Sequence, residues 1–214
     1  MVYKKPTSFL FFTVVISFMI PGCNNKKNTD SPKKDSIPLI KKDTSQISTG
    51  KPTSPPIINI TDTIAKKLIV VYIKDSSSTS EGISTKLAAI FRTRLPEYAK
   101  TQDIKITGPP MAWYKSHKAP FFFEAGYPVD KKPLKSVKNI LVKNIGGDSA
   151  VVAHFYGPYE YTIMGYEAIK DWLKSNKKKS SAPPYEVYIN DPFDRNLKAR
   201  DPYRVQTDII FPRK

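Results

Sequence analysis

Apolar residues are distributed unevenly along this chain. A twelve-residue apolar stretch covers residues 9–20, and a polar tract without regular apolar spacing follows as far as residue 60. Strand-like and helix-like apolar patterns then continue to the C-terminus. We therefore predict one folded domain over residues 61–214, preceded by a polar linker over residues 23–60 and an apolar leader over residues 1–22.

The first half of the predicted domain alternates between strand and helix patterns. Residues 68–73 form a short, β-branched apolar run that predicts a buried strand. Apolar positions then recur at helical spacing over residues 79–100, and Pro96 inside this pattern is expected to end or kink the helix. Strand patterns over residues 106–114 and 121–129 complete this half.

The second half repeats the order strand, helix, strand, strand. Its expected elements are strands over residues 137–145 and 149–155, a helix opened by Gly157-Pro158, and strands over residues 185–190 and 203–211. A unit that occurs twice predicts an α+β domain with a curved, mostly antiparallel sheet and two helices on one face.

The leader has the parts of an export signal. Lys4 and Lys5 precede the apolar stretch, which is shorter than the roughly twenty residues that a membrane-spanning helix needs. The segment Ile20-Pro21-Gly22-Cys23 resembles a bacterial lipobox, although Pro21 departs from the usual residue at its position. The resemblance implies a lipoprotein signal peptide over residues 1–22 and a lipid anchor on Cys23.

Cys23 is the single cysteine of the chain, so no disulfide can form within it. A lipidated cysteine followed by a polar linker predicts attachment to a membrane of the bacterial cell envelope, on the periplasmic side or at the outer membrane. The alternative is an ordinary signal peptide, or an uncleaved anchor, that happens to contain a cysteine.

The chain carries a formal charge of +16. Lys4 and Lys5 contribute +2, and residues 24–60, with seven lysines and three aspartates, contribute +4, which leaves +10 on the domain. This charge is scattered, with residues 177–179 as its one tight lysine run, so we expect no nucleic-acid partner. A basic surface that faces anionic lipid headgroups is a second use of the charge.

Four segments of the domain resemble the successive motifs of the GyrI-like effector-binding domain, which also forms the C-terminal sensor half of multidrug-responsive and AraC-type bacterial regulators. These segments are Gly108–Tyr114, Phe123–Val129, Val152–Glu160 and Pro183–Pro192. The resemblance spans approximately residues 64–214. It implies a pseudo-twofold domain whose two helices and sheet enclose a ligand cleft on the duplication axis.

The resemblance also implies that Glu186 is the central acidic residue that faces cationic or amphipathic ligands in that cleft. Alternation along a strand places Glu186 and Tyr188 on one sheet face, with Tyr185 and Val187 on the other. A carboxylate on an aromatic-lined concave face favours ligands that bring positive charge. We therefore predict affinity for flat organic cations.

Glu124 is a second candidate, because three phenylalanines precede it and Gly126 lets the strand turn. Its alternative role is that of a strand-end carboxylate capped by backbone amides. Five aromatic side chains are candidates either for lining the cleft or for packing the core. They are Trp113, Tyr114, Tyr159, Tyr156 and Trp172, of which the first three are the predicted ligand contacts.

His117 and His154 lack a second ligand at metal-binding spacing, so we interpret them as a turn residue and a strand residue and expect no metal or cofactor. The segment ahead of the domain shows no DNA-reading motif, which disfavours a transcription factor and an inhibitor of a cytoplasmic topoisomerase. The favoured function is a monomeric, membrane-anchored protein that binds a hydrophobic or cationic small molecule.

Two alternative functions stay open. The first is a hydrolase of reactive small molecules, in which Glu186 acts as general base on water and Tyr188 is its proton partner. The second is a tetrapyrrole-binding protein, although no histidine or methionine stands at a compelling ligand position.

Overall fold

The computed structural model describes residues 54–116, 118–135, 137–194, 196 and 198–214. The predicted signal peptide, Cys23 and His117 lie outside these residues. Among the helices of the described part of the chain, none has both the length and the apolar character needed to cross a bilayer.

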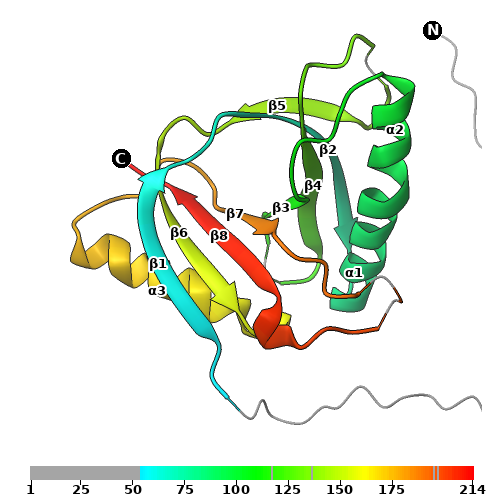
Figure 1. Cartoon of the computed structure of the whole chain (residues 1–214). Coiled ribbons are helices and arrows are strands. Elements are labelled where there is room, and N and C mark those ends of the chain that lie inside the picture. The colour runs from blue at the N-terminus through cyan, green and yellow to red at the C-terminus, as the bar shows by residue number, and fades with distance from the viewer. Residues whose placement is uncertain (1–53, 117, 136, 195, 197) are drawn as a thin grey trace, which may run out of the picture. The chain divides into compact units, whose positions relative to one another are not determined.

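The domain is built on one eight-stranded, antiparallel sheet in the order β1-β6-β8-β7-β3-β4-β2-β5 (Figure 1). Its strands are β1 Ile57–Ile64, β2 Leu68–Ser77, β3 Met111–Tyr114, β4 Phe121–Val129, β5 Leu141–Ile145, β6 Ser149–Tyr156, β7 Tyr185–Tyr188 and β8 Gln206–Pro212. Its α-helices are α1 Ser80–Ala89, α2 Leu95–Thr101 and α3 Thr162–Ser175. The predicted α+β fold is confirmed.

The sheet order is symmetric about its centre. Strands β6, β8 and β7 of the second unit mirror β2, β4 and β3 of the first, so that β3 and β7 lie side by side at the middle. There Ala112 pairs with Glu186 and Met111 pairs with Val187. The duplicated unit that the sequence predicts therefore meets its copy along these two short strands.

One long ribbon links the two halves of the sheet. The pairings β1 with β6 and β2 with β5 share a single register, which continues from Ile64 opposite Ser149 to Leu68 opposite Ile145. A backbone hydrogen bond of 2.9 Å from the N–H of Ala65 to the C=O of Asp148 bridges the gap between them. The same two chain segments therefore run through both halves.

The helices cover one face of the sheet, where two apolar clusters form. One includes Ile73 and Phe123 beneath α1 and α2, and the other includes Phe155 and Ile209 beneath α3. A third cluster lies on the opposite face. It contains Leu68, Val70, Tyr72, Met111, Trp113, Ile145, Tyr185, Val187 and Ile210. Both faces of the central strands are consequently buried.

The first helical segment does not end at Pro96, contrary to one of the two expectations from the sequence. A π-helical turn over Ile90–Arg94 joins α1 to α2, and Pro96 lies in the first turn of α2. Proline has no N–H to donate to the helical ladder, and the preceding π-helical turn already interrupts the regular i→i−4 bonding at this point. The helical path therefore continues to Thr101.

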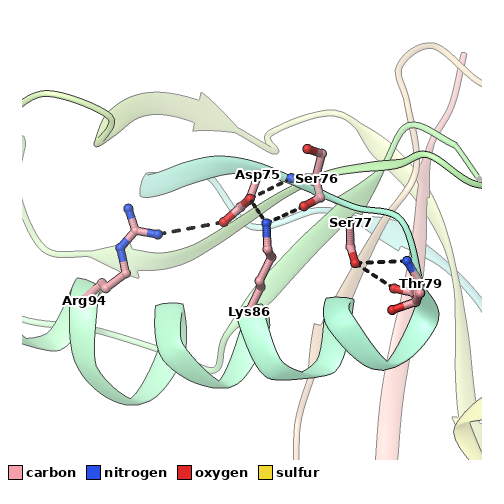
Figure 2. Close-up of polar contacts among 6 residues, drawn as sticks. All are labelled: Asp75, Ser76, Ser77, Thr79, Lys86 and Arg94. Carbon is pink, nitrogen blue, oxygen red and sulfur yellow. Dashed lines mark hydrogen bonds and ion pairs between the residues drawn. The ribbon is translucent and has the colours of Figure 1, made fainter. Parts of the chain in front are cut away.

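Polar contacts fasten this helical segment to the C-terminal part of β2 (Figure 2). Thr79 caps α1 by accepting a hydrogen bond of 3.0 Å from the N–H of Gly82. Asp75 binds Lys86 at 2.7 Å and Arg94 at 3.9 Å. Burial would raise the pKa of Asp75, but the hydrogen bonds from Lys86 and the Ser76 N–H, together with the charges of Lys86 and Arg94, lower the pKa overall.

Several strand boundaries differ from the sequence prediction. Strand β1 begins at Ile57, inside the segment predicted as linker, because all its residues from Ile57 to Ile64 pair with β6. Strand β3 begins only after Gly108-Pro109-Pro110, since proline has no N–H to donate to a ladder. Strand β8 begins at Gln206, after a 3-10 turn that contains Pro202.

Candidate ligand-binding site

Glu186 lies at the centre of the sheet, on the face that the helices cover. Its neighbour on β8 is Ile209, which belongs to the apolar cluster under α3. Its neighbour on β3 is Ala112, which is fully buried and has no side chain beyond Cβ. The Glu186 side chain is 2% exposed, so its carboxylate is held inside the protein.

Tyrosine hydroxyls supply the hydrogen bonds to this carboxylate. Tyr159 donates to Oε2 at 2.8 Å, and Tyr166 donates to Oε1 at 2.9 Å. Tyr159 lies in a 3-10 turn directly after Gly157-Pro158, and Tyr166 lies on the buried side of α3. The N-terminal part of the second helical segment therefore closes over Glu186.

The hydrogen-bonded network extends to two further tyrosines. The hydroxyls of Tyr114 and Tyr188 lie 2.8 Å apart, and the hydroxyls of Tyr159 and Tyr114 lie 3.0 Å apart. Tyr114 ends β3 and Tyr188 ends β7, and each stands four residues after a Pro-Pro pair. The network thus includes a corresponding tyrosine from each copy of the duplicated unit.

Burial determines the electrostatics of this cluster. It raises the pKa of Glu186, and the hydrogen bonds from Tyr159, Tyr166 and Tyr188 lower the pKa by less. Burial, followed by the nearby Glu186 charge, raises the pKa of Tyr114, of Tyr159 and of Tyr188. These phenols therefore stay protonated, and Tyr159 and Tyr188 hydrogen-bond to the carboxylate.

No lysine, arginine or histidine in the described ranges forms an ion pair with Glu186. The ion pairs of those residues use other carboxylates. A buried carboxylate without a cationic partner is costly, because the low-dielectric interior stabilises its charge less well than water does. The site is therefore suited to a ligand that brings one positive charge.

The outer side of the network is partly open and apolar. Tyr159 is 48% exposed although its hydroxyl reaches Glu186. Ile163 and Met164, in the first turn of α3, are also exposed. The Tyr159 side chain therefore extends from solvent to the buried carboxylate.

Glu124 and Trp113 lie on the opposite face from Glu186, which corrects their assignment to the same cleft. They are cross-strand partners. Strand alternation gives Phe123 and Ala125 to the helix-covered face, so the side chain between them points the other way. Glu124, Trp113 and Glu186 therefore cannot share one pocket on that face.

Lysines, rather than backbone amides, satisfy Glu124. Its oxygens lie 2.8 Å from Lys115, 2.9 Å from Lys143 and 3.9 Å from Lys74. The Lys143 ammonium also lies over the Trp113 ring, 3.1 Å from its centre. Burial would raise the pKa of Glu124, but Lys115 and Lys143 lower it overall.

Tyr166 was not among the site residues predicted from the sequence. The residue belongs to the buried stripe of α3 with Thr162, Ile169 and Leu173, so its helical spacing was a usable signal. Of the other aromatic candidates, Trp172 packs against the cluster under α3, and Tyr156 bonds Gln206 at 2.8 Å.

The described ranges contain no group of three or more histidine, cysteine, aspartate or glutamate side chains that could hold a metal ion. The carboxylate and its phenols can exchange protons and bind a cation. Roles for Glu186 as a general base and for Tyr188 as its partner, and tetrapyrrole binding, stay predictions.

No family model and no curated protein matches this sequence. Among solved structures, the EcmrR C-terminal domain is similar, with a TM-score of 0.59 and 19% identity over 74% of this chain and 98% of that domain. A longer EcmrR chain, in complex with DNA, has a TM-score of 0.59 and 18% identity over 74% of this chain. This chain spans 57% of that longer one.

A third structure, SAV2435 bound to tetraphenylphosphonium, has a TM-score of 0.43 and 13% identity over 73% of this chain and 94% of that protein. The likeness to the EcmrR C-terminal domain establishes a shared fold.

Proposed function

We propose that the folded domain binds a hydrophobic organic cation whose positive charge is neutralised by Glu186. One observation carries this proposal: the carboxylate is 2% exposed, hydrogen-bonded by tyrosines, and without a cationic partner among the described side chains. The resemblance to GyrI-like effector-binding domains and the fold shared with the EcmrR C-terminal domain support it.

The chemistry of the surroundings defines the ligand class. A small inorganic cation would give up its hydration shell for an aromatic site, whereas an organic cation with apolar substituents loses little hydration. Such a ligand also gains cation–π contacts with the rings of Tyr114, Tyr159 and Tyr188. The expected ligand is therefore a monovalent, aromatic or alkyl-substituted ammonium or phosphonium ion.

Two hydrophobic ions of similar shape and opposite charge test the proposal. We expect tetraphenylphosphonium to bind the full chain at least about tenfold more tightly than tetraphenylborate, because an anion would face the buried carboxylate. Isothermal titration of the protein in non-ionic detergent measures both affinities. Equal affinities would show that hydrophobicity alone drives binding and would contradict the role of Glu186.

We further propose that the domain is tethered to a membrane of the bacterial cell envelope through a lipid on Cys23. The support is the order of positive residues, apolar stretch and cysteine in the sequence. Each buried methylene contributes about 0.8 kcal/mol, so two or three acyl chains on one cysteine anchor a protein stably.

Replacing Cys23 by serine is expected to move the protein from the membrane fraction to the soluble fraction, since the acceptor sulfur of the lipid is lost. Fractionation of the native host, followed by immunoblotting, measures the distribution. A Ser36→Ala variant in the linker is the control and should stay with the membrane. Membrane association that persists in Cys23→Ser would refute the lipid anchor.

A further inference from the structure

Three side chains on adjacent strands form a hydrogen-bonded chain on the face away from Glu186. Thr61 lies on β1, His154 on β6 and Asp208 on β8. The distance from Thr61 Oγ1 to His154 Nε2 is 3.1 Å, and the distance from His154 Nδ1 to Asp208 Oδ1 is 2.7 Å. A hydroxyl, an imidazole and a carboxylate in this order have the geometry of a nucleophile, a base and an orienting acid.

Further contacts hold the carboxylate in place. The Gln206 amide donates to Asp208 Oδ1 at 2.8 Å, and its own oxygen accepts a hydrogen bond of 2.8 Å from the Tyr156 hydroxyl. The Asp208 side chain is 15% exposed and that of His154 is 30% exposed, whereas Thr61 is exposed. Hydrogen bonds therefore hold the Asp208 end of this chain of side chains in place, whereas the Thr61 hydroxyl is open to solvent.

The other copy of the duplicated unit has a lysine and a carboxylate at the corresponding place, 3.9 Å apart, with two more lysines bound to the carboxylate. Lys74 pairs with Glu124 across β2 and β4, in the positions that His154 and Asp208 occupy across β6 and β8. The sheet structure at this position therefore accommodates a lysine beside a carboxylate and does not require a histidine. His154 differs from Lys74 because it has a second nitrogen, which lies within hydrogen-bond distance of the Thr61 hydroxyl. A lysine has no second nitrogen that could make this contact.

The backbone N–H that follows Thr61 in the chain is not used for strand pairing. The Ala65 N–H donates to Asp148 on the neighbouring segment. In an antiparallel pair, the N–H groups of successive residues point alternately toward the partner strand and away from it. The Asp62 N–H therefore points away from β6, to the outer edge of β1. Arg213 binds the Asp62 carboxylate, with Nε at 2.8 Å, on the face away from Thr61. The amide after the nucleophile is a usual oxyanion donor in hydrolases.

We propose that Thr61, His154 and Asp208 form a second site, which transfers acyl groups from small, activated esters to water. The Thr61 oxygen bonds to the ester carbonyl carbon while His154 Nε2 takes the hydroxyl proton. The bond to the leaving oxygen then breaks, and His154 returns the proton to that oxygen. A water molecule repeats both steps on the acyl-threonine, which releases the acid and restores the hydroxyl.

Hydrolysis of para-nitrophenyl acetate by the full chain in non-ionic detergent tests this proposal. All variants carry Cys23→Ser so that the thiol does not contribute. We expect Thr61→Val, which keeps the shape and removes the hydroxyl, to lower kcat/KM at least tenfold. Thr61→Ser should keep the activity, and Thr63→Val, on the same face of β1, should leave it unchanged.

Two further readouts separate chemistry from structure. A fluorophosphonate should lose fluoride and form one adduct, mapped to Thr61 by peptide mass spectrometry and absent in Thr61→Val. Asp208→Asn, a change in a positioning residue, should lower kcat at least tenfold with little change in KM. Equal rates for the parent and a folded Thr61→Val protein, or labelling at other residues only, would overturn the proposal.

Discussion

Replacing Glu186 by glutamine is expected to lower the affinity for tetraphenylphosphonium at least about 30-fold. The amide has nearly the same shape but carries no charge, and removal of one partner from a buried charge pair costs about 2 kcal/mol or more. Isothermal titration at neutral pH measures the loss. Unchanged affinity in a folded Glu186→Gln protein would place the cation elsewhere.

The same substitution should stabilise the ligand-free protein at neutral pH. Burial raises the folded-state pKa of Glu186 above its unfolded value, so the folded state holds the proton more tightly. The contribution of this group to stability is therefore greatest below the unfolded pKa and falls as pH rises through the folded pKa. Thermal denaturation should show a higher Tm for Glu186→Gln at neutral pH, with the difference vanishing in acid.

Glu124→Gln is the matched control, because Glu124 is a buried carboxylate of the opposite kind. Burial would raise the pKa of Glu124, but the hydrogen bonds and the charges of Lys115 and Lys143 together lower the pKa in the folded state. Its contribution to stability is thus present above the unfolded pKa and is lost as pH falls through the folded pKa. Glu124→Gln should lower Tm at neutral pH and leave tetraphenylphosphonium affinity unchanged.

Replacing Gly126 by alanine is expected to destabilise the domain by about 3 kcal/mol, near the upper end for overpacked cores. An added Cβ would lie 2.6 Å from the Val71 carbonyl oxygen and 2.8 Å from the Tyr72 Cβ. The contact with the carbonyl is with backbone inside the β2–β4 ladder, which cannot shift without breaking strand pairing. Chemical denaturation measures the change in the free energy of unfolding.

Gly165→Ala on α3 is the comparison for this prediction. Its added Cβ would also have a close neighbour at 2.6 Å, but that neighbour is the flexible Cδ1 end of Ile209. Alanine also gains up to about 1 kcal/mol in helix propensity over glycine. We expect Gly165→Ala to lie within about 1 kcal/mol of the parent, and equal stabilities of the two variants would contradict the backbone argument.

Local periodicity made much of the fold predictable from the amino-acid sequence. The strand-helix-strand-strand order occurs twice because each copy repeats the same apolar spacing, and the structure confirms this arrangement. Alternation along β7 correctly assigned Glu186 and Tyr188 to one face and Tyr185 and Val187 to the other. These features depend on residues close together in the chain, where the backbone repeat alone decides the direction of a side chain.

Contacts between distant segments decided the rest. Tyr159 and Tyr166 reach Glu186 only because the second helical segment folds back over β7. The lysines that bind Glu124 come from three other places in the chain, and β1 becomes a strand by pairing with β6. The sequence alone determined which side chains share a face of one element, whereas the packing of elements far apart in the chain determined which charges and hydroxyls meet, because no local repeat encodes those distances.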